Sequence, residues 1–187
     1  MGVVGETKGD NAYSDYKEDA TISPENCDVI HFEVFNPVKA KEEWAISFPT
    51  NCKSVRIVIN GEDFCDIANK MDCERFLKEN PCCGNANEPM YGHGELRWIY
   101  DGLIEAFTEG SYAHDCGLEL LCCWECGDAG CWSVVAHFRQ DENYVYWENF
   151  EHNHRDWEYD FSFRFSKIDY YKELVALKAY LEGSSAQ

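Results

Sequence analysis

The residues from 122 to 132 are the part of this sequence whose types and spacing could do chemistry. They read CCWECGDAGCW, with four cysteines around a Gly-Asp-Ala-Gly turn. Cys123 and Cys126 have the Cys-x-x-Cys spacing of a zinc knuckle, and Cys131 is close enough in sequence to supply a third thiolate. The fourth ligand of a tetrahedral zinc site would come from another nearby thiol or histidine: Cys122, Cys116, His114 or His137.

Two other interpretations of this segment are open. In an extended strand Cys122 and Cys123 point to opposite faces, so at most one of them joins a site. The pattern favours a glycine-cornered β-hairpin whose thiols pack as small apolar groups. Thiol–disulfide catalysis is disfavoured, because no helix follows Cys126 to lower its pKa and the neighbouring carboxylates oppose a thiolate.

A second set of candidate ligands lies in the segment from 151 to 156, which reads EHNHRD. In an extended conformation His152 and His154 share one face, where they could bind a metal ion together with Asp156 or Glu151. Two histidines in an acidic loop are more typical of a solvated surface. If these histidines do form a site, the chain would be a small hydrolase-type enzyme that uses His152 and His154, which is the second alternative function.

The stretch from 141 to 160 is both acidic and aromatic. This composition is typical of a surface that binds a basic protein, because Trp and Tyr supply contact area and carboxylates supply complementary charge. The alternative is that the aromatic side chains face the core and the acids are ordinary solvated groups. The predicted partner-binding residues are Trp147, Glu148, Glu151, Trp157, Glu158 and Tyr159.

The overall composition favours binding over catalysis. The 187 residues carry 16 basic and 35 acidic side chains, and the formal net charge of −19 disfavours nucleic acid and anionic membranes as partners. The sequence contains no P-loop, G-x-G-x-x-G, G-x-S-x-G or HExxH motif. It also shows no signal-peptide pattern and no long apolar run, so we expect a cytoplasmic protein whose 11 cysteines are mostly free thiols.

The elements that would position these residues form one α+β domain with a mainly antiparallel sheet, ending in a β-meander and a C-terminal helix. Alternating apolar residues predict strands at 28–35, 43–48, 54–61, 118–124, 131–139, 144–150 and 161–165. Helical spacing predicts about three helices, at 66–78, 96–107 and 166–183. The expected organisation is a flexible acidic arm at 1–26, the domain at 27–183 and a tail at 184–187.

Three finer expectations concern local structure. The residues from 151 to 160 are expected to form a loop. The strand at 144–150 should direct Val145, Trp147 and Asn149 to one face. The buried side of the last helix should consist of Ile168, Tyr171, Leu174, Val175 and Leu181.

The last third of the chain carries three motifs: C-G-x-x-G-C-W at 126–132, V-x-W-x-x-F at 145–150 and F-x-F-x4-Y at 163–170. With these motifs the chain resembles a group of small, acidic, intracellular bacterial proteins over residues 118–175, and more weakly over 53–60. Some members are similar in size and charge to immunity proteins of toxin systems. Members often carry a cysteine where this chain has Trp124, so the resemblance implies a shared fold but neither a fixed metal site nor a known reaction.

The predicted function is therefore a non-enzymatic, cytosolic, acidic binding protein of immunity or inhibitor type, which masks a basic protein partner. The first alternative is a structural zinc-binding protein that uses Cys123, Cys126 and Cys131, and no cofactor other than zinc is expected. Zinc analysis of the purified protein separates the two functions.

Overall fold

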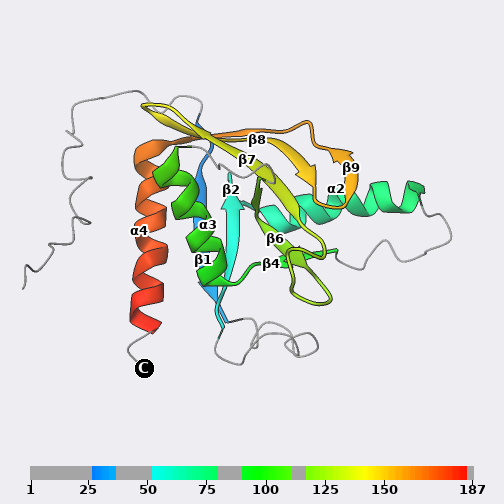
Figure 1. Cartoon of the computed structure of the whole chain (residues 1–187), viewed down its shortest axis with the longest axis horizontal. Coiled ribbons are helices and arrows are strands. Elements are labelled where there is room, and N and C mark those ends of the chain that lie inside the picture. Colours follow the sequence, from blue (N-terminus) through cyan, green and yellow to red (C-terminus); the bar gives the residue numbers. More distant parts are fainter. Residues whose placement is uncertain (1–26, 37–51, 80–89, 111–116, 185–187) are drawn as a thin grey trace, which may run out of the picture.

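Three helices pack against antiparallel sheets in a computed structural model of the chain (Figure 1), which describes residues 27–36, 52–79, 90–110 and 117–184. The helices are α2 (Phe64–Glu79), α3 (Leu96–Glu109) and α4 (Lys167–Ser184). Every pairing between the named strands is antiparallel. The predicted α+β class, the number of helices and the C-terminal helix are confirmed. Among the helices that the structure describes, none combines the length and apolar character needed to cross a membrane.

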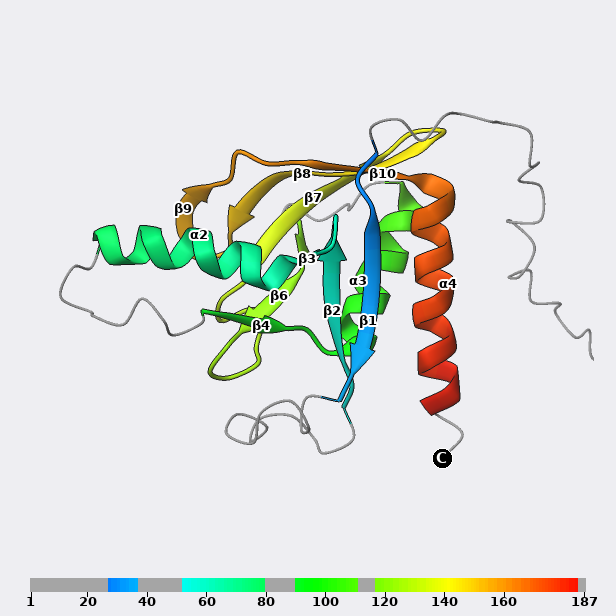
Figure 2. The ribbon, with the colours of Figure 1, turned by 180° about the vertical axis from the view of Figure 1, so that it is seen from behind.

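The first sheet has the order β1-β2-β3 and consists of β1 (Ile30–Phe35), β2 (Ser54–Ile59) and β3 (Glu62–Asp63). Its apolar face is buried, as the alternation in the sequence predicts. Asp63 then starts α2, because its Oδ1 accepts a hydrogen bond from the backbone N–H of Cys65 at 2.9 Å. Figure 2 shows β1 and β2 side by side, with α2 leading away from β3. The strand predicted at 43–48 lies outside the described residues.

The second sheet has the order β10-β8-β7-β5. Strand β10 pairs with the first half of β8, and β9 pairs with its C-terminal end. Its strands are β5 (Leu118–Glu119), β7 (Val134–Gln140), β8 (Tyr144–His152), β9 (Arg155–Glu158) and β10 (Phe163–Ser166). The meander is thus present in β5, β7 and β8. The prediction of a loop at 151–160 is wrong, because β8 continues to His152 and the chain then turns back into β9.

A third, two-stranded sheet joins β4 (Tyr91–His93) to β6 (Leu121–Cys123). The single strand predicted at 118–124 is therefore divided between two sheets. Its first part, β5, pairs with β7, whereas β6 pairs with β4. This division matters for the cysteines, because β6 ends at Cys123 and residues 124–133 form the loop between β6 and β7.

A β-bulge changes the side-chain phase in the middle of β8. The register with β7 shifts between Val135 and His137, and Asn149 has φ of 50°. Trp147 and Phe150 are both buried, three positions apart, whereas Asn149 is exposed. The prediction that Asn149 shares a face with Trp147 is therefore wrong, because the extra residue turns the second part of β8 over.

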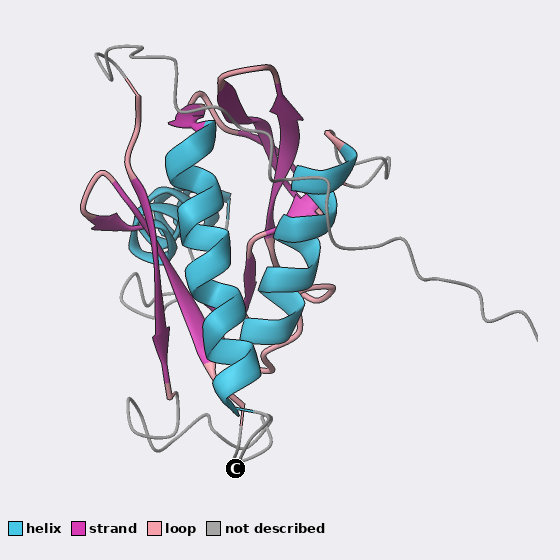
Figure 3. Cartoon of the chain, turned by 90° about the vertical axis from the view of Figure 1, so that its left-hand side faces the viewer, coloured by secondary structure: helices cyan, strands magenta, loops and turns pink. Residues whose placement is uncertain are grey.

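Helices α3 and α4 lie side by side and cover one side of the core (Figure 3). Gly102 permits a close approach of α3 to β5, because a Cβ at this position would lie 2.7 Å from Leu118 Cδ1. In α4 the buried residues are Tyr170, Leu174 and Leu177.

The predicted buried side of α4 is only partly correct. Ile168 is 57% exposed and Val175 is 47% exposed. Tyr170 determines which side of α4 is buried, because its ring packs against Trp147 and Phe107 in the core. Ile168 and Val175 lie off this stripe and face solvent.

Candidate metal centre

Three of the four cysteines between 122 and 132 come together at the surface. The sulfur atoms of Cys123, Cys126 and Cys131 all lie within 4.8 Å of one another. Cys126 and Cys131 are exposed and Cys123 is half-buried, so solvent reaches the group. We call these three residues the thiol cluster. The expectation that these thiols fill space inside a hairpin is corrected, since only Cys122 is buried.

The backbone of the loop between β6 and β7 brings the sulfur atoms together. Cys123 is the last residue of β6, and its backbone N–H donates to Asp128 O at 3.1 Å. The Cys123 carbonyl accepts from the backbone N–H of Gly127 at 2.9 Å. Gly127 has φ of 73°, a conformation that strongly favours glycine. This tight turn returns the chain toward β6 and places Cys126 and Cys131 next to Cys123.

A turn on the neighbouring hairpin binds the other side of the loop. Asn153, between β8 and β9, donates from Nδ2 to Ala129 O at 2.8 Å and accepts at Oδ1 from Ser133 N–H at 3.0 Å. His154 donates from Nε2 to Gly130 O at 2.5 Å. We call Asn153 and His154 the hairpin clamp. Both residues hold the segment that carries Cys131, although neither contributes a ligand atom to the thiol cluster.

His152 lies beside the hairpin clamp among aromatic rings. It is 4% exposed, and its ring centroid is 4.1 Å from that of Trp132 and 5.3 Å from that of Trp157. Its Nδ1 accepts the backbone N–H of His154 at 3.0 Å. Burial lowers the pKa of His152 to about 4, and the charge of Arg155 acts in the same direction. The imidazole is therefore neutral near pH 7 and supports Trp132, the residue after Cys131.

The expected metal site at His152 and His154 finds no support in this geometry. Both rings are used within the β7–β9 region, one in packing and one in a hydrogen bond to the loop. Glu151 lies 3.6 Å from His137, and Asp156 is exposed. Over the described ranges, the thiol cluster is the single group of three or more candidate metal ligands.

Hydrogen bonds distribute the protons unequally within the thiol cluster. The backbone N–H of Asp128 lowers the pKa of Cys126. Hydrogen bonds with Cys126 and Cys123 raise the pKa of Cys131 to about 12. Cys126 is therefore the better thiolate, and Cys131 keeps its proton. A metal ion that binds three thiolates must displace the remaining protons, so metal binding should release protons to the solvent.

The donor set fits a thiophilic metal ion such as zinc. Zinc–sulfur bonds are about 2.3 Å long, so tetrahedral thiolates around one ion are separated by roughly 3.8 Å. The thiol cluster already spans no more than 4.8 Å. No fourth ligand residue from the described part of the chain belongs to this group. Cys122 and His137 are thus excluded as fourth ligands by position, whereas Cys116 and His114 lie outside the described residues.

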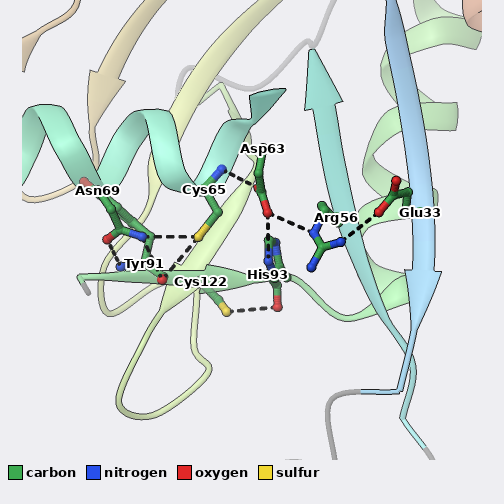
Figure 4. Close-up of polar contacts among 8 residues, drawn as sticks. All are labelled: Glu33, Arg56, Asp63, Cys65, Asn69, Tyr91, His93 and Cys122. Atoms are coloured by element: carbon green, nitrogen blue, oxygen red, sulfur yellow. Dashed lines mark hydrogen bonds and ion pairs between the residues drawn. The ribbon is translucent and has the colours of Figure 1, made fainter. Parts of the chain in front are cut away.

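The buried thiols have a different environment (Figure 4). Cys122 donates from Sγ to His93 O at 3.3 Å, and burial raises its pKa to about 12. Cys65 donates from Sγ to Tyr91 O at 3.3 Å, and burial raises its pKa as well. Both thiols are packed and protonated. The predicted separation of Cys122 from Cys123 by strand alternation is confirmed.

The predicted partner-binding aromatic residues lie in the core, which corrects the surface expected from the sequence. Trp147 is 0% exposed, Trp157 is 8% exposed and Tyr159 is 7% exposed. Trp147 packs edge-on against Phe165, and the Tyr159 hydroxyl donates to the buried Asp72 Oδ2 at 2.5 Å. These three side chains cannot contact a partner while the domain is folded, because strand alternation and the bulge turn them inward.

The glutamates of the predicted partner-binding surface differ in their exposure to solvent. Glu151 is exposed, and Glu148 is half-buried and accepts from Arg139 Nε at 2.9 Å. Glu158 belongs to β9, but its side chain lies outside the described part of the structure. The 141–160 region therefore presents carboxylates without the Trp and Tyr contacts that were predicted to accompany them at 147, 157 and 159.

An open pocket of about 560 Å³ lies along the first turns of α2. Ile67 and Met71 are half-buried and give it an apolar surface, and most of the remaining lining is charged. The lining residues are Gly61, Glu62, Asp63, Asp66, Ile67, Lys70, Met71 and Glu74. The pocket therefore combines four carboxylates with one ammonium group.

Asp63 is the member of this pocket that is tied to the fold. Its Oδ2 forms an ion pair with Arg56 Nε at 2.9 Å and lies 3.3 Å from His93 Nε2. Arg56 in turn donates from Nη1 to Glu33 Oε2 at 2.8 Å, which makes a polar chain across β1, β2, β3 and β4 (Figure 4). Glu62, Asp66 and Glu74 are exposed, so they are the carboxylates of the pocket that a ligand can reach.

The hydrogen bonds of Asn153 and His154 to the loop were not predicted from the sequence. Their hydrogen bonds reach residues 129–133, about twenty positions earlier, and depend on the pairing of β7, β8 and β9. The available signal was the pair Asn153-His154 between two extended stretches, since asparagine is common in two-residue hairpin turns.

Compared with known protein families, with curated proteins and with solved structures, the chain matches none. The resemblance to small acidic bacterial proteins therefore stays a prediction, and the function of the chain is inferred from its own geometry.

Proposed function

We propose that this protein binds a zinc ion through the thiolates of Cys123, Cys126 and Cys131, and that the metal holds the β6–β7 loop in a fixed conformation. The observation that carries the proposal is the convergence of three sulfur atoms within 4.8 Å. Soft thiolate ligands select zinc and related thiophilic metals over calcium or magnesium. Two glycines and an acidic residue in the loop supply the tight turn that such ligands need.

A structural role for the metal agrees better with the surroundings than a catalytic role. His154 is held by Gly130 O, and His152 is buried with its Nδ1 occupied. Neither imidazole is placed to act as a general base at the thiol cluster. The hairpin clamp instead fixes the loop from outside, as the outer-shell hydrogen bonds of metal sites do.

Metal content measured by plasma mass spectrometry tests this proposal. We expect one zinc ion per chain in protein purified without chelator, and loss of most of it in Cys123→Ser, Cys126→Ser and Cys131→Ser. Cys52→Ser is the matched control, because Cys52 lies outside the loop and its replacement should leave the zinc content unchanged. Zinc-free wild-type protein, or equal zinc in all four variants, would contradict the proposal.

We propose as a second function that the acidic chain binds a basic segment of a protein partner at the α2 pocket. This proposal keeps the predicted partner class and moves the site away from residues 141–160. It is supported by the net charge of −19 and by a pocket that joins exposed carboxylates to an apolar surface. A lysine or arginine side chain next to an apolar residue complements both features.

Charge-matched variants separate the two candidate surfaces. The probe is a synthetic peptide of lysine and leucine residues, titrated at low and high salt. In the pocket variant, Glu62→Gln, Asp66→Asn and Glu74→Gln, we expect affinity to fall about tenfold or more. The control, Glu142→Gln, Glu151→Gln and Asp156→Asn, removes the same charge from the 141–160 region and should retain affinity. Equal losses in both variants would indicate non-specific attraction and contradict a pocket site.

A further inference from the structure

We infer that the thiol cluster is also an oxidation site, at which a peroxide converts Cys126 and Cys131 into a disulfide and the bound metal ion is released. The disulfide follows from the position of the thiols in the fold. The release of metal rests on the proposed zinc-binding function.

The structure separates these two thiols from the other described cysteines. Cys126 and Cys131 are exposed and lie in the same surface loop, whereas Cys65 and Cys122 are buried. An oxidant in solution therefore reaches the loop thiols first. The sulfur atoms of the pair are already within 4.8 Å of each other, so a small movement of the loop brings them to bonding distance.

Cys123 is the member of the thiol cluster that lies in a strand. It lies in β6 opposite Tyr91 of β4, and its backbone N–H and carbonyl are hydrogen-bonded to Asp128 and Gly127. Cys126 and Cys131 are joined by only four residues, which include Gly127 and Gly130 and lie outside regular strands. The loop pair can therefore adjust its geometry without breaking the pairing of a sheet, which is why the disulfide joins Cys126 to Cys131.

Peroxide forms the disulfide in two steps. In the first, the Cys126 thiolate attacks a peroxide oxygen, the O–O bond breaks, and a sulfenic acid and hydroxide form. In the second, that hydroxide takes up the Cys131 proton and becomes water, and the Cys131 sulfur attacks the sulfenic sulfur. The S–S bond forms, and a second hydroxide leaves and takes up a proton from the solvent to become water. Two thiols lose two electrons in total, and one hydrogen peroxide is reduced to two water molecules.

Formation of the disulfide removes two of the three protein ligands from the metal. Zinc requires deprotonated sulfur ligands and is not held by one thiolate on a surface loop. The ion therefore leaves, and reduction of the disulfide by an added thiol restores the site. The site would thus couple metal content to the supply of peroxide.

The test treats zinc-loaded and zinc-free full-length protein with hydrogen peroxide. Zinc release is followed with a coloured chelator, and disulfides are located by peptide mass spectrometry without reduction. We expect a Cys126–Cys131 disulfide, a mass lower by two hydrogens, and release of zinc in step with it. Cys123→Ser should still form the disulfide, whereas Cys126→Ser and Cys131→Ser should not. Dithiothreitol should reverse the change in the wild-type chain.

The two preparations distinguish failure of this inference from failure of the zinc proposal. Absence of the disulfide in zinc-free protein, or a disulfide that includes Cys123, overturns the inference whatever the zinc content. Zinc release without a disulfide also overturns it. If the protein never binds zinc but forms the Cys126–Cys131 disulfide, the oxidation site stands and the zinc proposal fails.

Discussion

At the scale of single residues, His152 has a titration that should be visible in the stability of the whole domain. Burial lowers its pKa to about 4, whereas in an unfolded chain its pKa is about 6.5. Above pH 6.5 the imidazole is neutral in both states and contributes no pH dependence. As the pH falls from 6.5 toward 4, the unfolded chain takes up a proton that the folded chain does not. The free energy of unfolding should therefore decrease over this range.

We predict a loss of about 2 kcal/mol from His152 between about pH 7 and about pH 5, measured by urea denaturation. His152→Phe keeps an aromatic ring in the space between Trp132 and Trp157 and should remove this loss. His137→Phe is the control, because His137 lies at the surface of β7 and its removal should leave the loss in place. The same pH dependence in wild-type protein and His152→Phe would show that His152 is not the group responsible.

Single residues also show what the sequence can predict about the thiol cluster. The alternation of β6 predicts that Cys122 and Cys123 point in opposite directions, and the structure confirms it. The exposure of Cys126 and Cys131 could not be predicted in the same way, because neither lies in a strand with a fixed period. Their proximity to Cys123 depends on the geometry of a turn in which Gly127 has a positive φ angle.

At the scale of elements, the β8–β9 hairpin acts as an outer support for the β6–β7 loop. Asn153 provides two side-chain hydrogen bonds, one to Ala129 and one to Ser133. We predict that Asn153→Ala lowers the free energy of unfolding by about 1–3 kcal/mol, since two loop groups lose their partners. We also predict that zinc affinity falls about tenfold or more, as for other outer-shell hydrogen bonds.

The control for this variant is Asn143→Ala. Asn143 lies in the exposed turn between β7 and β8, at the opposite end of this hairpin from Val134 and His152. Its replacement should leave zinc affinity unchanged in a competition titration with a chelator of known affinity. Equal zinc affinity in Asn153→Ala and wild-type protein would mean that the hairpin clamp does not support the metal site.

Several elements were predictable from local pattern and others were not. The apolar alternation of β1 and β2 and the spacing in α3 match their predicted positions closely. The pairing of β6 with β4 was not predictable, because it joins residues about thirty positions apart and β4 has only three residues. The bulge at Asn149 was also missed, and it reverses the face of every later residue in β8.

At the scale of the whole molecule, the thiol cluster lies outside the main core. The core consists of the apolar faces of the sheets and the aromatic residues under α3 and α4, where Tyr170 packs against both Trp147 and Phe107. None of the cysteines in the thiol cluster belongs to it. Loss of the metal should therefore release a local region and leave the domain folded.

Hydrogen exchange with and without chelator checks this expectation. We predict faster exchange after metal removal in residues 121–133 and 152–155, and unchanged protection in β1, β2 and α4. The Cys126→Ser variant should show the same local pattern without chelator. Loss of protection throughout the chain would mean that the metal supports the fold as a whole, as in small zinc domains that unfold without it.

X-ray absorption at the zinc edge shows directly whether three sulfur atoms of this chain bind one zinc ion. We predict three sulfur neighbours at about 2.3 Å and one lighter neighbour, oxygen or nitrogen, at about 2.0–2.1 Å. In Cys131→Ser protein loaded with zinc, the number of sulfur neighbours should fall. A zinc ion surrounded by oxygen and nitrogen alone in the wild-type protein would mean that the thiol cluster does not bind the metal.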